Sequence, residues 1–169
     1  MSATVRPAAP ADRDLVTALL TRSWGTPIMV AAGEQFDASA LPALIAWRDD
    51  KPVGLLTYRL HPDGLEVATI DAFTRHEGVG SLLLDAAIGT ARDHNAPRLW
   101  LITTNDNLDA LRFYQRRGLR LTALSPGAVD DSRRLKPSIP LLGDYDIEIH
   151  DELTLTLELR PQSPSGQIQ

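Results

Sequence analysis

The chain has 169 residues, no cysteine, and 17 basic against 22 acidic side chains, which gives a net charge of −5. This length fits a single domain that buries its own core without disulfides. The absence of cysteine excludes a disulfide scaffold, a thiolate metal site and a cysteine nucleophile. The 4 histidines lie far apart in the sequence, so no local histidine pair predicts a metal site. The net acidic charge argues against general binding of nucleic acid.

Targeting and membrane signals are also lacking. No apolar stretch is long enough for a transmembrane helix, so we expect no membrane partner. Arg6, Asp12 and Asp14 stand where a signal peptide needs an apolar core, which predicts a cytoplasmic protein. We expect a single domain over residues 1–160 and a disordered tail over 161–169, because the tail consists almost entirely of proline, serine, glutamine and glycine.

The first half of the chain reads as a mixture of strands and one helix. A short strand is expected over residues 3–6, and a helix then begins near 10–12 and ends at Trp24-Gly25. Residues 28–41 show no clear pattern. Three further strands are predicted over residues 44–47, 53–59 and 65–73.

In the second half of the chain, the spacing of the apolar residues changes. Apolar residues recur at helical spacing over residues 79–93, and residues 99–102 form an apolar run typical of a strand buried on both faces. Residues 105–107 are expected to cap a helix over 108–117 that Gly118 ends. Two strands are then predicted over residues 119–124 and 147–159. This order predicts an α/β fold, with residues 125–146 as a long loop.

The segment between the predicted strand over 65–73 and the predicted helix over 79–93 carries a phosphate-binding signal. Residues 75–80 read Arg-x-x-Gly-x-Gly, a turn whose backbone N–H groups meet the positive end of the helix dipole. A dinucleotide fingerprint would need a third glycine where Leu83 stands, and a P-loop would need a lysine before Ser81. A nicotinamide-dependent oxidoreductase is therefore disfavoured. A turn that binds nothing is the remaining alternative on this motif alone.

A second motif follows about thirty residues later. The helix over 108–117 carries Asn107-x-x-Ala110-x-x-Phe113-Tyr114-x-x-x-Gly118. With both motifs on the expected elements, the chain resembles the GNAT superfamily of acetyl-CoA-dependent N-acetyltransferases. The resemblance covers the order of elements along the whole chain and is sharpest over residues 65–124.

The resemblance implies a fold and an activity. The fold is a central mixed β-sheet of about six or seven strands flanked by helices, with a splayed pair of parallel strands at the cofactor site. The activity is transfer of an acetyl group from acetyl-CoA, as co-substrate and without a metal, to a primary amine of a small molecule or protein. It also implies a possible homodimer. A non-catalytic acyl-CoA-binding sensor is the alternative.

The resemblance also implies the residues that hold the cofactor. The turn binds the CoA pyrophosphate, the end of the preceding strand pairs with the pantetheine arm, and the second motif contacts the arm and the sulfur. These residues are Asp71, Ala72, Phe73, Arg75, His76, Glu77, Gly78, Val79, Gly80, Ser81, Asn107 and Tyr114. Glu77 departs from the family pattern, because a carboxylate beside a pyrophosphate is unfavourable unless it points outward.

Acetyl transfer needs a neutral amine. Removing the proton from a lysine-like amine at pH 7 costs about 4.6 kcal/mol of free energy. By resemblance, Glu66 is the candidate general base, with Asp71 as second choice. The alternative is that Glu66 is a surface residue of the strand with no catalytic role. Tyr114 is the candidate acid for the leaving thiolate, or else packs its ring on the arm. A backbone N–H near Ala72 or Phe73 is expected to stabilise the oxyanion.

The acceptor is less well defined. By resemblance, Trp24 borders the acceptor site. Arg133, Arg134 and Lys136 form a basic run in the long loop, which is either solvated or part of a lid that anchors an anionic group.

Overall fold

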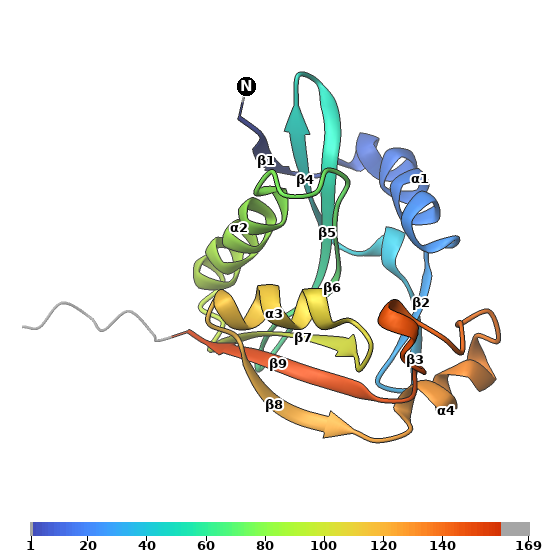
Figure 1. Ribbon diagram of the computed structural model, residues 1–169. Coiled ribbons are helices and arrows are strands. Elements are labelled where there is room, and N and C mark those ends of the chain that lie inside the picture. The colour runs from blue at the N-terminus through green and yellow to red at the C-terminus, as the bar shows by residue number, and fades with distance from the viewer. Residues whose placement is uncertain (1, 160–169) are drawn as a thin grey trace, which may run out of the picture.

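The computed structural model describes residues 2–159, and one mixed sheet dominates it (Figure 1). The sheet has seven strands in the spatial order β1-β4-β5-β6-β7-β9-β8, and β2 and β3 form a separate hairpin. The strands are β1 (Thr4–Pro7), β2 (Ile28–Ala31), β3 (Glu34–Asp37), β4 (Ala43–Arg48), β5 (Lys51–His61), β6 (Gly64–Ala72), β7 (Arg98–Thr104), β8 (Arg120–Ser125) and β9 (Glu152–Glu158).

Four α-helices accompany the strands in the described residues, namely α1 (Arg13–Trp24), α2 (Val79–Asp93), α3 (Leu108–Arg116) and α4 (Ala128–Leu135). Helices α1 and α2 cover opposite faces of strands β4 to β6 (Figure 1). Neighbouring residues of β5 point to these two faces, because side chains alternate along a strand. Leu55 packs in the cluster beneath α1, and Leu56 packs in the cluster beneath α2.

Helix α2 forms where the apolar spacing predicts it. Its buried residues recur at helical spacing and lie against the larger core cluster. They are Val79, Leu83, Leu84, Ala87 and Ala91. Burying each leucine contributes about 1.5–3 kcal/mol, so this face fixes the helix and the turn before it against the sheet.

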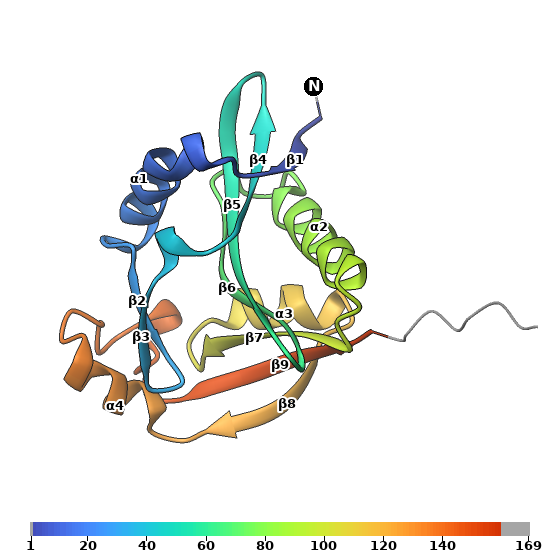
Figure 2. The same ribbon diagram turned by 180° about the vertical axis from the view of Figure 1, so that it is seen from behind.

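The parallel pair β6 and β7 is joined at one end only. Its register runs from Leu65 opposite Leu99 to Val67 opposite Leu101. Beyond this point β6 continues to Ala72 with β5 alone as partner. Figures 1 and 2 both show β7 turned away from the line of β6. The predicted mixed sheet with a splayed parallel pair is therefore confirmed.

One prediction on local structure is wrong, and one segment that carried no prediction forms regular structure. Residues 28–41, where the sequence showed no pattern, contain the hairpin β2–β3, whose turn places Ala32 and Gly33 at positive φ. The predicted long loop over 125–146 contains α4, a short helix with two i,i+3 ion pairs, Asp130–Arg133 and Asp131–Arg134. Its few apolar residues were too sparse to reveal it.

Burial in β7 also differs from the prediction. The strand alternates, with Leu99, Leu101 and Thr103 buried and Trp100 and Ile102 half-buried, so its second face is only partly covered. Within residues 2–159, helices long and apolar enough to cross a membrane are absent. The single domain over 1–160 stays a prediction, and the tail predicted over 161–169 lies outside the described residues.

Candidate functional site

The turn between β6 and α2 has the shape of an anion site. His76 and Gly78 adopt positive φ angles of 62° and 75°, and Gly78 is the N-cap of α2. The N-terminal N–H groups of a helix lack carbonyl partners within the helix, and its dipole adds partial positive charge. The turn therefore offers several N–H donors to one negatively charged group.

A groove of about 970 Å³ begins at this turn and continues to α3. It is lined by many of the residues predicted to hold the cofactor. These are Ala72, Arg75, His76, Gly78, Val79, Gly80, Ser81, Asn107 and Tyr114. Asp71, Phe73 and Glu77 do not line it. The structure thus brings the two sequence motifs together along one continuous surface.

Sequence reasoning missed the basic wall of the groove. Arg112 and Arg116, four residues apart, share one face of α3 and line the groove with Arg117. Arg117 also contacts the Ser81 hydroxyl and lies 3.7 Å from an Asp85 oxygen. The spacing of these arginines was the signal available in the sequence. With Arg75 they make the groove locally basic in an acidic chain, which suits an anionic ligand.

Glu77 points away from the groove. Its carboxylate is bound by the Arg48 guanidinium at the end of β4, and this partner holds the pKa of Glu77 below its usual value. Arg48 therefore neutralises the one carboxylate of the turn. The unfavourable charge that the sequence suggested is compensated by a residue 29 positions away.

Tyr114 is buried at the inner end of the groove. It is 7% exposed and lies on α3, edge-on to Phe113 with ring centroids 5.4 Å apart. Burial, and then the negative charge of Asp71, raise the pKa of Tyr114 well above its usual value. The hydroxyl therefore stays protonated at neutral pH and is available as a hydrogen-bond donor.

The backbone of β6 is only partly satisfied at its splayed end. The Phe73 N–H donates to the Val53 carbonyl at 2.9 Å, so this N–H is taken. In an antiparallel ladder, alternate residues direct their N–H and C=O groups to opposite sides. Ala72 therefore directs its N–H toward the side from which β7 has separated. Of the two predicted oxyanion donors, Ala72 has the available geometry.

Glu66 lies at the joined end of β6, on the α1 face of the sheet. Its carboxylate accepts from Arg59 Nε at 3.1 Å and Arg59 Nη2 at 3.2 Å, and lies 2.8 Å from His61 Nε2. It is buried and does not line the groove. The prediction that Glu66 is the general base stays a prediction, but the carboxylate already has two partners.

Asp71 lies on the same face at the splayed end of β6. Trp24 Nε1, at the end of α1, donates to Asp71 Oδ2 at 2.7 Å. Burial raises the pKa of Asp71, and only the bond from Trp24 opposes this shift. The structure thus brings Trp24, Asp71 and Tyr114 together from three separate elements.

Two further predicted residues act differently from expectation. The Asn107 side chain does not cap α3, because its Nδ2 donates to Thr103 Oγ1 at 3.0 Å. Arg133 donates to the carbonyls of Ile139, Pro140 and Ile149, so its guanidinium holds the segment after α4 together. The idea that Arg133 anchors an anionic substrate is therefore wrong.

Lys136 joins α4 to the hairpin. Its Nζ donates to the Ile28 carbonyl on β2 at 3.0 Å, and burial lowers the pKa of its ammonium group. Figures 1 and 2 both show α4 beside β2 and β3. Lys136 is thus part of the fold around the hairpin, whereas Arg134 is exposed and pairs with Asp131 on its own helix.

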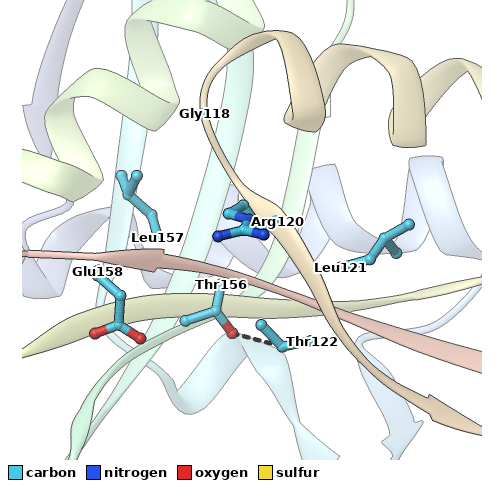
Figure 3. Close-up of a pocket in the computed structure, with 7 residues that line it drawn as sticks. All are labelled: Gly118, Arg120, Leu121, Thr122, Thr156, Leu157 and Glu158. Atoms are coloured by element: carbon cyan, nitrogen blue, oxygen red, sulfur yellow. Dashed lines mark hydrogen bonds between the residues drawn. The ribbon is translucent and has the colours of Figure 1, made fainter.

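A second hollow of about 600 Å³ lies beside the edge strand β8 and its neighbour β9 (Figure 3). It is lined by Gly118, Arg120, Leu121, Thr122, Thr156, Leu157 and Glu158. Thr122 and Thr156 are hydrogen-bonded to each other at 2.9 Å across it. It contains none of the turn's N–H donors and no buried tyrosine, so the groove between α2 and α3 is the candidate active site.

A helix N-terminus, basic side chains and a buried tyrosine lie along one groove beside the splayed parallel pair, an arrangement that suits a long anionic ligand. Residues 13–119 match the model of the "Acetyltransferase (GNAT) family". Protein YxbD of Bacillus subtilis (strain 168) is 41% identical over 155 residues, covering 91% of this chain and 98% of YxbD. The chain belongs to the acetyltransferase (GNAT) family.

Solved structures share the fold. A GNAT family acetyltransferase from Elizabethkingia anophelis with acetyl-CoA bound has a TM-score of 0.68 and 20% identity, covering 94% of this chain and 99% of that one. Naa50 of Arabidopsis thaliana, in complex with the bisubstrate analogue CoA-Ac-MVNAL, has a TM-score of 0.68 and 19% identity, covering 94% of this chain and 100% of that one. Family and fold together support an acyltransferase that uses acetyl-CoA.

Proposed function

We propose that this protein is an N-acetyltransferase that moves an acetyl group from acetyl-CoA to a primary amine of a small molecule or peptide. The observation that carries the proposal is the continuous groove from the phosphate-binding turn to the buried Tyr114. The analogue CoA-Ac-MVNAL bound to Naa50 supports an amine as the acceptor.

The residues present fit the cofactor. The N–H groups of the turn and the side chains of Arg75 and the α3 arginines would hold its phosphates. When bound, acetyl-CoA supplies a thioester whose C–S bond breaks as the amine nitrogen forms the new C–N bond. The Ala72 N–H would stabilise the oxyanion that develops on the acetyl oxygen.

Tyr114 would donate its proton to the departing thiolate. With ordinary pKa values of about 10 for a tyrosine and 8.5 for a thiol, this transfer is uphill by only about 2 kcal/mol. Burial and the Asp71 charge make it harder, because both raise the pKa of Tyr114. A cation bound at Asp71 would cancel part of that effect. The acid function of Tyr114 is therefore coupled to the charge state of its neighbour.

A carboxylate of β6 would remove the amine proton. Glu66 is the base that the sequence favours, and it would act through water or through His61, to which it is hydrogen-bonded. Asp71 is the second candidate, and its charge is felt by Tyr114. The two differ in a measurable way, because only replacement of the true base should abolish the rise of the turnover rate with pH that accompanies ionisation of that carboxylate.

The alternative of a non-catalytic acyl-CoA sensor depended on Glu77 weakening the phosphate site. The pairing of Glu77 with Arg48 compensates the charge of this carboxylate and so argues against a weakened phosphate site.

The homodimer also remains a proposal. It is supported by the edge strand β8, whose six residues are all exposed and include Leu121 and Leu124. Light scattering after gel filtration would measure the molar mass directly.

The first experiment is a melting-temperature series with acetyl-CoA, CoA, NADH and ATP. At a hundredfold excess over Kd, a true ligand stabilises the protein by about 2.7 kcal/mol. We expect a shift with the two CoA species alone, followed by acetylated product from a panel of primary amines. Product mass and its resistance to hydroxylamine separate an N-acetyl from an O-acetyl group. Binding without any product would favour the sensor.

A further inference from the structure

Asp71 is a half-buried carboxylate without a cationic partner. Within residues 2–159, no arginine, lysine or histidine forms an ion pair with it, and its Oδ1 accepts no hydrogen bond. Its single partner is the indole N–H of Trp24. Burying a carboxylate costs free energy unless an opposite charge compensates it. A site with this imbalance gains most from a cation that arrives from outside the protein.

Trp24 offers a second feature that suits a cation. Its side chain is 47% exposed although its N–H is held by Asp71. Arg6 lies 4.5 Å from the ring centroid of Trp47, and Arg98 lies 4.3 Å from that of Trp100. In the part of the chain that the structure describes, no such cation lies over Trp24. An indole face attracts ammonium groups within about 6 Å.

Asp71 and Trp24 lie next to the groove that forms the candidate active site. Ile70 and Ala72, the neighbours of Asp71 along β6, both line the groove. The negative charge of Asp71 acts on Tyr114 at the inner end of that groove. Asp71 itself faces α1, on the side of the sheet opposite to α2. A group bound there approaches the splayed strands from the side that the phosphate-binding turn leaves open.

We propose that Asp71 and Trp24 form the binding site for the acceptor's ammonium group, which enters as a cation from the α1 face of the sheet. This inference rests on the proposed function and adds a substrate class to it. The acceptor carries a charged primary ammonium close to an apolar or extended body, and a neutral arylamine or an alcohol is a poor substrate. One ammonium N–H would donate to Oδ1, and the indole face would contact the charge.

Each proton that moves in the reaction can be assigned to one of these residues or to solvent. The ammonium nitrogen gives one proton to Asp71, and its freed electron pair forms the bond to the acetyl carbon. A second proton leaves that nitrogen for solvent as the amide forms, and Asp71 then passes its proton to solvent as well. The sulfur takes the Tyr114 proton when the C–S bond breaks, and solvent restores it. The net products are the amide, CoA thiol and one released proton.

The test measures binding of amines to the protein–CoA complex by calorimetry. The cationic probes are butylammonium, benzylammonium and spermidine, and the neutral counterparts are butanol and benzyl alcohol. We expect Asp71→Asn to weaken binding of the cationic probes about 10- to 100-fold, the range for a charge-assisted hydrogen bond, while neutral probes and CoA bind as before. Trp24→Leu should weaken cationic binding about 3-fold or more.

Asp93→Asn is the matched control, because it removes one exposed carboxylate at the far end of α2 and changes the net charge equally. It should leave all affinities unchanged. Equal binding of cationic probes to wild type and Asp71→Asn would overturn the inference. So would a wild-type complex that binds none of the cationic probes. A protein that fails to bind CoA would instead refute the proposed function.

Discussion

Strand β6 has a carboxylate near each end, Glu66 buried and Asp71 half-buried, and their surroundings differ. Glu66, where β6 is joined to β7, is surrounded by Arg59 and His61. Asp71, where β6 stands apart from β7, has one neutral donor, Trp24. Burial by itself therefore does not mark a functional carboxylate. The feature that separates the two carboxylates of β6 is the presence or absence of a cationic partner.

The first prediction tests the comparison between Glu66 and Asp71 by removing Glu66, the carboxylate whose charge is compensated. Glu66→Ala leaves the Arg59 side chain, only 16% exposed, without its main partner. Removing one partner of a buried ion pair costs about 3–5 kcal/mol, which a urea titration measures. Glu34→Ala is the control, because Glu34 is an exposed partner of the same arginine and should cost at most about 1 kcal/mol. Unchanged stability with lost turnover would instead make Glu66 the base.

The second prediction concerns the acid. Tyr114→Phe should lower kcat about 100-fold, because it removes the proton for the leaving group but keeps the ring that packs in the core. The Kd for acetyl-CoA should change little. Tyr58→Phe, a tyrosine that packs against the same core and does not line the groove, is the matched control. Wild-type turnover in Tyr114→Phe would remove the acid role.

A third carboxylate, Glu77, sharpens the comparison in the phosphate-binding turn. Arg48→Ala should weaken acetyl-CoA binding about 5- to 10-fold, because it leaves the negative charge of Glu77 uncompensated beside the phosphates. Arg48 itself does not line the groove, so the substitution removes no direct contact with the ligand. Glu77→Gln alone should have little effect, and the double variant should restore the affinity. Calorimetry of the four proteins gives the coupling between the two residues. A double variant as weak as Arg48→Ala would refute this positioning role.

The smallest expected effect is a gain in stability. Because burial raises the pKa of Asp71 in the folded state, its contribution to stability is present at low pH and is lost as the pH rises through that value. Asp71→Asn should therefore melt like wild type near pH 3 and a few degrees above it at pH 7, where about 1 kcal/mol corresponds to about 2–4 °C. Glu66→Gln should not melt above wild type at pH 7. A lower melting temperature for Asp71→Asn at pH 7 would show that its charge is compensated after all.

Local patterns in the sequence determined the main elements and much of the cofactor site. The period of α2 and the glycine turn before it are set by residues within one short stretch, so they can be read in order. The second motif on α3 locates Tyr114 in the same way. Hairpin β2–β3 and helix α4 could not be read, because Lys136 and Glu152 stabilise them through bonds to Ile28 and Ala32, more than a hundred residues away.

The sign and balance of the buried charges were decided only by tertiary structure. The partner of Glu77 is 29 residues distant and the partner of Asp71 is 47 residues distant. An acidic side chain in a sequence carries no record of which cation, if any, folding brings to it. By resemblance the sequence favoured Glu66 as the reactive carboxylate, whereas of the two carboxylates of β6 it is Asp71 that has no positive partner in the described residues.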